Sequence, residues 1–257
     1  MKKTPTFIIL CLLCIVLNAQ NDNILVEYKA TKGRIVNNET LIAYGGAALY
    51  LTDSLLIERD NMPITNEDEY NNHITISQKR IQLDATAYYL KPGDNTIFFT
   101  QQHMDTPGMV KDVLPHYQWD LSHNETKTIG DFVCRKATTE FRGSQIVAWY
   151  TETINIPFGP WKFKDLPGLI LELYNINSST THSWTAVKIK YPYKNTVDYN
   201  FDSDTPLIDY QTVVFEREKK IKEQIRRMQS RVPAGVMATE TKINRTGIEK
   251  TYEWENR

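Results

Sequence analysis

The sequence predicts an α+β domain dominated by a strongly curved, half-open barrel-like antiparallel sheet, with one long amphipathic helix packed on it. Three observations lead to this fold class. Short β-branched and aromatic runs, separated by turn residues, recur through most of the chain, which is typical of strands. One segment, residues 207–231, changes to helical spacing. Once a leader is set aside, about 238 residues remain, enough for one large β-rich domain.

The amino terminus is typical of a secretory signal peptide. Lys2 and Lys3 precede an uninterrupted apolar run over residues 7–17, and the chain then turns polar. The run is shorter than the roughly 20 residues that span a bilayer. We therefore predict a signal peptide over residues 1–19 and a single domain over residues 20–257.

No other segment is apolar enough to cross a membrane, so the mature chain is expected to lack a transmembrane segment. It is expected to be periplasmic, secreted or associated with the cell envelope. The leader holds two of the 30 basic residues and none of the 31 acidic ones, which leaves a mature net charge of −3. This balance argues against nucleic acid as a partner, because nucleic-acid binding needs a basic surface.

Cys134 is the one cysteine that remains after the leader is removed, so no internal disulfide is possible. A single cysteine in an exported protein is either buried and inert or paired with another molecule. A strand position between Val133 and Arg135 favours a small buried side chain.

Strands are predicted in the first half of the chain by alternating or β-branched runs. Residues 48–52 and 54–58 flank Asp53 and resemble a hairpin. Residues 60–73 are polar and acidic, which indicates a loop. The other predicted strands are residues 24–30, 81–90, 96–101 and 116–120.

Two hairpins are predicted in the second half. Residues 132–141 and 145–152 flank Arg142-Gly143-Ser144, and residues 169–176 and 182–191 flank an Asn-Ser-Ser turn. The alternation of apolar and polar residues along a strand indicates which face of the sheet each side chain occupies. The core face is expected to hold Leu169, Leu171 and Leu173, and a second apolar face Val187, Ile189 and Tyr191.

A helix is predicted over residues 207–231, where Asp204-Thr205-Pro206 supplies a cap and a proline start. An amphipathic helix of this kind usually packs its apolar face on a sheet, and a membrane-surface or partner helix is the alternative. The tail adds a possible edge strand at residues 248–254. The apolar stripe consists of Tyr210, Val214, Ile221, Ile225 and Met228.

No catalytic motif or cofactor-binding signature is recognisable, so an enzyme is not favoured and no cofactor is expected. The candidate metal ligands are His103, Met104, Met109 and His116. Thioether and imidazole groups suit copper(I), but their spacing fits no fixed geometry, and the methionines equally suit packing.

Several aromatic side chains lie close together in sequence: Trp149, Tyr150, Trp161 and Trp184. They suit packing within a sheet, or an aromatic-lined groove for an apolar or sugar ligand.

Residues 159–168 are expected to form a rigid, twice-turned corner. Pro160 restricts the backbone, and Pro167-Gly168 fits the centre of a type II turn, with positive φ at the glycine. If the intervening segment alternates, Trp161 and Phe163 pack while Lys162 and Lys164 stay in water. Replacing Lys162 is then expected to cost little stability.

The 45 residues DFVCRKATTEFRGSQIVAWYTETINIPFGPWKFKDLPGLILELYN resemble the signature of the GLPGLI family, exported proteins of Bacteroidetes-type bacteria. Asp165 replaces the motif's first glycine, so a left-handed turn is not expected there. The resemblance implies export and a β-rich domain, but no catalytic residue, because the family has no established activity. The matching residues include Cys134, Trp149, Tyr150, Pro157, Gly159, Pro160, Trp161, Lys162, Leu166, Pro167, Gly168, Leu169 and Ile170.

The sequence thus favours a non-enzymatic, exported binding or envelope-assembly protein with an aromatic-lined concave sheet. Its partner would be a small apolar ligand, a glycan or an envelope protein. Two alternatives stay open. A hydrolase acting on peptide or glycan would be favoured by a cleft with several strongly shifted pKa values, and a copper-handling or other metal-handling protein by stabilisation on binding metal.

Overall fold

The structure is a computed structural model that describes residues 23–44, 46–52, 55–57, 81–83, 86–91, 93–101, 108–193, 206–230 and 245–255. The predicted signal peptide, the predicted loop at residues 60–73, and His103 and Met104 lie outside these residues.

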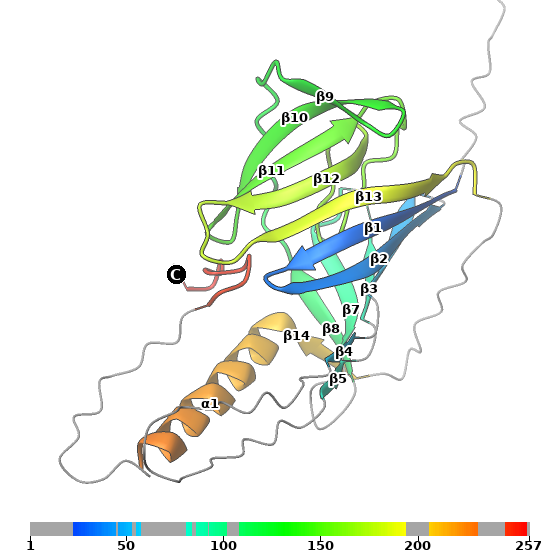
Figure 1. Ribbon diagram of the computed structural model, residues 1–257. Coiled ribbons are helices and arrows are strands. Elements are labelled where there is room, and N and C mark those ends of the chain that lie inside the picture. Colours follow the sequence, from blue (N-terminus) through cyan, green and yellow to red (C-terminus); the bar gives the residue numbers. More distant parts are fainter. Residues whose placement is uncertain are drawn as a thin grey trace, which may run out of the picture.

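Twelve strands in the described part of the chain form one strongly curved sheet, which confirms the β-dominated α+β fold class (Figure 1). The order is β14-β8-β7-β6-β3-β2-β1-β13-β12-β11-β10-β9, antiparallel except for the β14–β8 pair. The first strands are β1 (Ile24–Lys32), β2 (Ile35–Tyr44), β3 (Ala47–Thr52), β6 (Ala87–Leu90), β7 (Thr96–Gln101) and β8 (Gly108–Val113). The others are β9 (Thr126–Ile129), β10 (Phe132–Phe141), β11 (Ser144–Thr151), β12 (Leu169–Ile176), β13 (His182–Lys190) and β14 (Leu207–Asp209).

The core lies where the curved sheet brings distant parts of the chain together. The Tyr28 hydroxyl on β1 donates a hydrogen bond to the Ile170 carbonyl on β12 at 2.6 Å. Tyr117 and Trp119, in the segment after β8, donate to the carbonyl oxygens of Lys162 and Lys164. These contacts fix the corner before β12 against the rest of the fold.

The two predicted hairpins of the second half are confirmed. Between β10 and β11, Arg142 and Gly143 have φ values of 45° and 76°, the pattern of a two-residue type I′ turn. Strands β12 and β13 pair as expected, and Leu169, Leu171 and Leu173 are fully buried. Both predictions depend on residues close in sequence.

Several strand predictions are wrong, most of them in the first half of the chain. Strand β3 pairs with β2 and β6, whereas β4 (Leu55–Ile57) pairs with β5 (Ile81–Leu83) in a separate two-stranded sheet. The predicted strand at residues 81–90 is thus two strands. Residues 116–120 and 248–254 form no strand, and β2, β8, β9 and β14 were not predicted.

The predicted apolar face of residues 187–191 is wrong at Val187 and at Tyr191, which are 57% and 45% exposed. The register against β1 shifts here: Tyr28 pairs with Ala186, and Glu27 with Lys188. A β-bulge inserts one residue and reverses the alternation beyond it. Trp184 consequently points into the core, while Val187 faces solvent.

The single described helix, α1 (Tyr210–Gln229), begins three residues later than predicted, because Leu207–Asp209 pair with β8. Tyr210 and Val214 of the predicted stripe are buried, but Ile221 and Ile225 are only half-buried. The helix therefore packs through its first turns and then projects from the sheet (Figure 1). The structure contains, within the described residues, no helix with the length and apolar character needed to span a membrane.

The corner before β12 is tighter than a type II turn. The Gly168 N–H donates to the Leu166 carbonyl at 2.7 Å, which closes a three-residue turn around Pro167. Gly168 has the predicted positive φ, at +152°, but the type II turn itself is wrong. Asp165 has φ of 68°, so a left-handed residue does occur where the GLPGLI motif has glycine. Aspartate is among the residues that tolerate this conformation.

Candidate functional site

A buried cluster of four charged side chains joins four separate segments of the fold. Arg142 lies in the β10–β11 turn, Asp112 on β8, Lys162 in the corner before β12, and Glu249 in the carboxyl-terminal segment. Arg142 contacts both oxygens of Asp112, at 2.7 and 2.9 Å, and also pairs with Glu249. The Lys162 ammonium lies 2.8 Å from Asp112 and 2.8 Å from Glu249. The cluster thus ties β8, the hairpin turn, the corner and the carboxyl-terminal segment together.

Lys162 is where the sequence prediction fails most clearly. Its side chain and that of Lys164 were expected in water, but they are 1% and 0% exposed. Trp161 has φ of 55°, which breaks the alternation on which the prediction rested. Lys162 therefore turns into the core, where the carboxylates of Asp112 and Glu249 compensate its charge.

Aromatic rings enclose the two cations of the cluster. The Lys162 ammonium lies 4.2 Å from the Tyr210 ring centroid and 4.9 Å from that of Trp161. A cation over an aromatic face is stabilised by the ring quadrupole, more so when it is desolvated. The Arg142 guanidinium lies within 6 Å of the ring centroids of Phe141, Tyr210, Tyr252 and Trp254.

The pKa values of the groups in the cluster are shifted in the direction that favours the charged form of each group. Burial would raise the pKa of Asp112, but Lys162 and Arg142 outweigh it and hold that pKa below its ordinary value. The pKa of Glu249 is likewise lowered, against burial, first by Lys162 and then by Arg142. Burial would lower the pKa of Lys162, but Glu249 and Asp112 raise it. All four groups are therefore charged at neutral pH and poorly suited to proton transfer.

These shifts predict an acid-dependent loss of stability. Because the folded-state pKa values of Asp112 and Glu249 lie below their ordinary values near 4, their contribution is present above about pH 4 and is lost as the pH falls through the folded values. Urea unfolding from pH 7 to pH 2.5 should show this loss. Asp112→Asn should remove much of the dependence, whereas the exposed-site control Asp131→Asn should leave most of it. A wild-type stability that is constant below pH 4 would contradict the prediction.

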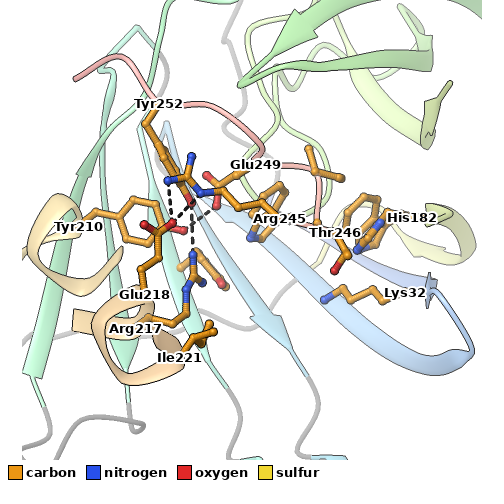
Figure 2. Close-up of a pocket in the computed structure, with 15 residues that line it drawn as sticks. Lys32, His182, Tyr210, Arg217, Glu218, Ile221, Arg245, Thr246, Glu249 and Tyr252 are labelled. Carbon is orange, nitrogen blue, oxygen red and sulfur yellow. Dashed lines mark hydrogen bonds and ion pairs between the residues drawn. The ribbon is translucent and has the colours of Figure 1, made fainter. Parts of the chain in front are cut away.

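A cavity of about 470 Å³ opens beside the buried cluster. Figure 2 shows Arg217, Glu218 and Ile221 of α1 on one side, and Lys32 and His182 on the other. Residues 245–249 of the carboxyl-terminal segment lie between the two sides, and Glu249 belongs to both the cavity wall and the buried cluster. The cluster therefore holds one wall of the cavity in place.

Two tryptophans belong to the aromatic part of the wall, together with Tyr88, Tyr210 and Tyr252. Trp161 is half-buried, whereas Trp184 is 1% exposed. The Trp161 and Trp184 rings stack with centroids 6.1 Å apart and an interplanar angle of 11°. Glu39, which is 1% exposed, orients this wall: it accepts hydrogen bonds from the Trp184 indole N–H at 2.7 Å and from Lys32 at 2.6 Å. The buried carboxylate thus fixes both an indole and an ammonium at the cavity.

Polar groups converge on the cavity from three elements. Burial lowers the pKa of His182, so its imidazole is neutral at neutral pH. Arg245 pairs with Glu218 at 2.6 Å, which joins the carboxyl-terminal segment to α1. Arg217 is exposed and donates a 3.4 Å hydrogen bond to the Tyr252 hydroxyl. The cavity therefore combines an indole pair with several hydrogen-bonding groups.

The structure brings together only part of the aromatic set predicted from the sequence. Trp161 and Trp184 line the cavity, whereas Tyr150 is buried in the sheet. Trp149 packs with the Lys127 ammonium 4.5 Å from its ring centroid. Sheet packing therefore accounts for two of the four aromatic residues.

The other candidate residues lie away from the cavity. Cys134 is buried without a disulfide, and burial raises the pKa of its thiol to about 11. Met109 is buried on β8, and the His116 Nε2 lies 2.9 Å from the Asn95 amide nitrogen. In the described residues, no three His, Cys, Asp or Glu side chains are grouped so that they could hold a metal ion.

The remaining motif residues build the corner behind the cavity. A Cβ atom at Gly159 would lie 2.6 Å from the Ile170 Cδ1, so glycine permits the close approach of the corner to β12. Leu166, Leu169 and Ile170 are buried beneath it. In the same corner lie Pro157, Pro160, Pro167 and Gly168. Of the motif residues, Trp161 lines the cavity and Lys162 supports it.

Sequence reasoning missed Asp112, Arg142, Arg217, Arg245 and Glu249. The sequence assigns Arg142 to a hairpin turn and to the GLPGLI resemblance. A long charged residue where a two-residue hairpin turn favours Asn, Asp or Gly is unusual, and that is a signal. The others carry no local signal. Apart from Glu255 and the Lys250 carbonyl, which lie 10 and 5 residues from Arg245, their partners lie 27 to 107 residues away along the chain.

The fold and site together define a β-dominated protein whose curved sheet supports a charged, aromatic-lined cavity. Comparison with protein families identifies a match over residues 55–212 to the family described as N-glycanase peptide, N-terminal domain. The chain belongs to this family. The match includes Trp161, His182 and Trp184 but not Lys32, Arg217 or Arg245. Comparison with curated proteins gives no match. The GLPGLI resemblance, the signal peptide and the single domain over residues 20–257 stay predictions.

Three solved structures show distant similarity. Two structures of PNGF-II, in space groups C2 and P21, have 14% and 15% identity and TM-scores of 0.47 and 0.49. The matches cover 73% and 75% of this chain but 30% and 32% of those, so the chain spans about a third of their length. The LolA superfamily protein NE2245 from Nitrosomonas europaea has 7% identity and a TM-score of 0.26, over 66% of this chain and 86% of that one.

Proposed function

We propose that the cavity between α1 and the curved sheet is a carbohydrate-binding site, and that the protein binds glycans without converting them. The observation that carries the proposal is the half-buried Trp161, whose ring stacks on the buried Trp184 and lines a cavity with His182, Lys32 and Arg217 around it. A sugar ring presents an apolar C–H face and a rim of hydroxyls. An aromatic surface suits the first, and converging polar side chains suit the second.

Two further facts support the proposal. The volume of about 470 Å³ is within the range of roughly 300–1,000 Å³ that is usual for small-molecule sites. The family's description names an N-glycanase, an enzyme class whose substrates carry glycans. The predicted signal peptide would export the chain to where such substrates are found.

The directions of the pKa shifts favour binding over hydrolysis. A glycan hydrolase needs a carboxylic acid whose pKa is raised, so that it can donate a proton near neutral pH. The carboxyl group with a shifted pKa at this cavity is Glu249, and its pKa is lowered. The second carboxylate of the wall, Glu218, is engaged by Arg245. The groups with shifted pKa values are therefore better suited to holding the cavity wall in place than to acting as an acid–base pair.

The proposal is tested by binding of the full chain to an array of glycans, followed by calorimetric titration of the sugars that bind. His182→Ala should weaken binding about tenfold, because it removes a cavity-lining hydrogen-bonding group. His123→Ala, in a loop outside the cavity lining, should leave affinity unchanged. Absence of glycan binding, or equal losses in the two variants, would contradict the proposal.

A further inference from the structure

Two carboxylates at the cavity, Glu39 and Glu249, are already saturated with donors from the protein. Glu39 accepts hydrogen bonds from Lys32, Asn37, Tyr50 and Trp184. Glu249 accepts from Arg142, Lys162 and Tyr210, and Glu218 accepts from Arg245. Glu39 and Glu249 therefore have little capacity left to bind the hydroxyl donors of a ligand, and Glu218 is paired with Arg245.

The donors are not saturated in the same way. Arg217 carries five N–H donors, and within the described residues its hydrogen bond is the 3.4 Å contact to the Tyr252 hydroxyl. No carboxylate of the described part of the chain forms an ion pair with it. Lys32 gives one of its three ammonium donors to Glu39. Figure 2 shows that Arg217 and Lys32 approach the cavity from opposite sides.

A donor-rich cavity favours a ligand rich in acceptors. A neutral sugar offers hydroxyls, each of which both donates and accepts. A carboxylate only accepts, and its geometry matches the planar fork of a guanidinium. His182 supplies one acceptor: because the Thr180 carbonyl can only accept, the Nδ1 nitrogen donates to it at 3.4 Å, which leaves Nε2 to accept from a sugar hydroxyl.

We infer that the cavity selects saccharides that bear a carboxylate, with Arg217 binding the carboxylate and the half-buried Trp161 ring packing against the sugar ring. This inference rests on the proposed carbohydrate-binding function and adds the class of sugar. Uronic acids and sialic acids share the required chemistry. Arg217 and Lys32 lie outside the region that matches the family, so the selectivity is a feature of this chain rather than of the family match.

The test is calorimetric titration of the full chain with two matched pairs of sugars. One pair is trigalacturonic acid and its neutral counterpart galactotriose, and the other is sialyllactose and its carboxylate methyl ester. We expect the acidic member of at least one pair to bind about tenfold tighter or more, as a charge-assisted bidentate contact does. The pair that shows the difference identifies which acidic sugar is bound.

The variants Arg217→Gln and Arg227→Gln complete the design, because both residues are exposed on α1 but only Arg217 lines the cavity. Arg217→Gln should reduce the preference for the acidic sugar to about twofold or less, because it weakens binding of the acidic sugar more than that of the neutral one, and Arg227→Gln should leave both affinities unchanged. Equal affinity within both pairs, or an effect shared by the two variants, would overturn the inference and leave the proposed function standing. No binding of any of the four sugars would count against the proposed function itself.

Discussion

Replacing Lys162 by methionine is expected to destabilise the folded protein by about 3 kcal/mol or more. The ammonium is 1% exposed and lies 2.8 Å from both Asp112 and Glu249. Its removal leaves two buried carboxylates with Arg142 as their remaining cation in the cluster. An undercompensated buried charge costs far more than the loss of a surface ion pair.

Urea unfolding at pH 7 measures the effect, and Lys188→Met is the matched control. Lys188 pairs with Glu27 at 2.6 Å, but its side chain is 49% exposed, so the same substitution should cost under about 1 kcal/mol. A similar loss of unfolding free energy in the two variants would contradict the buried cluster. It would favour an exposed Lys162, as the alternation in the sequence predicts.

Replacing Gly168 by alanine is expected to cost about 3 kcal/mol or to prevent folding. A Cβ atom at this position would lie 2.1 Å from the Thr151 carbonyl oxygen and 2.7 Å from its carbon. Both are backbone atoms of β11, so no side-chain rotation relieves the overlap. The positive φ of +152° adds strain of about 1–3 kcal/mol for a residue other than glycine.

Gly130→Ala separates these two causes. Gly130 also has positive φ, at +57°, but nothing lies within 4 Å of its Cβ position. Its replacement should therefore cost only the backbone strain, about 1–2 kcal/mol. Chemical denaturation of both variants gives the difference. If Gly168→Ala is no less stable than Gly130→Ala, close contact with Thr151 is not the reason for the glycine.

The parts of the fold that could be predicted from the sequence are those determined by neighbouring residues. The Arg142-Gly143 turn sets the register of β10 and β11, and the alternating leucines of β12 identify its buried face. The pairing of β3 with β2 and β6, instead of with β4, depends on the whole sheet and has no such local determinant. The bulge at Val187 likewise follows from pairing with β1.

The candidate site could be predicted only through its aromatic residues. Trp161 and Trp184 stand out by type, and a sugar-binding groove was one of the two interpretations of the aromatic set. The charged half of the site depends on contacts over long distances in sequence: Lys162 meets Asp112 50 residues away and Glu249 87 residues away. A lysine in a loop is exposed by default, and only such partners make its burial possible.

The most direct test of the carbohydrate-binding proposal is a crystal structure of the full chain with sialyllactose or trigalacturonic acid. The account predicts a sugar ring against Trp161, with its carboxylate within hydrogen-bond distance of Arg217. A sugar bound elsewhere on the protein, with the cavity beside Glu249 free of it, would contradict the account.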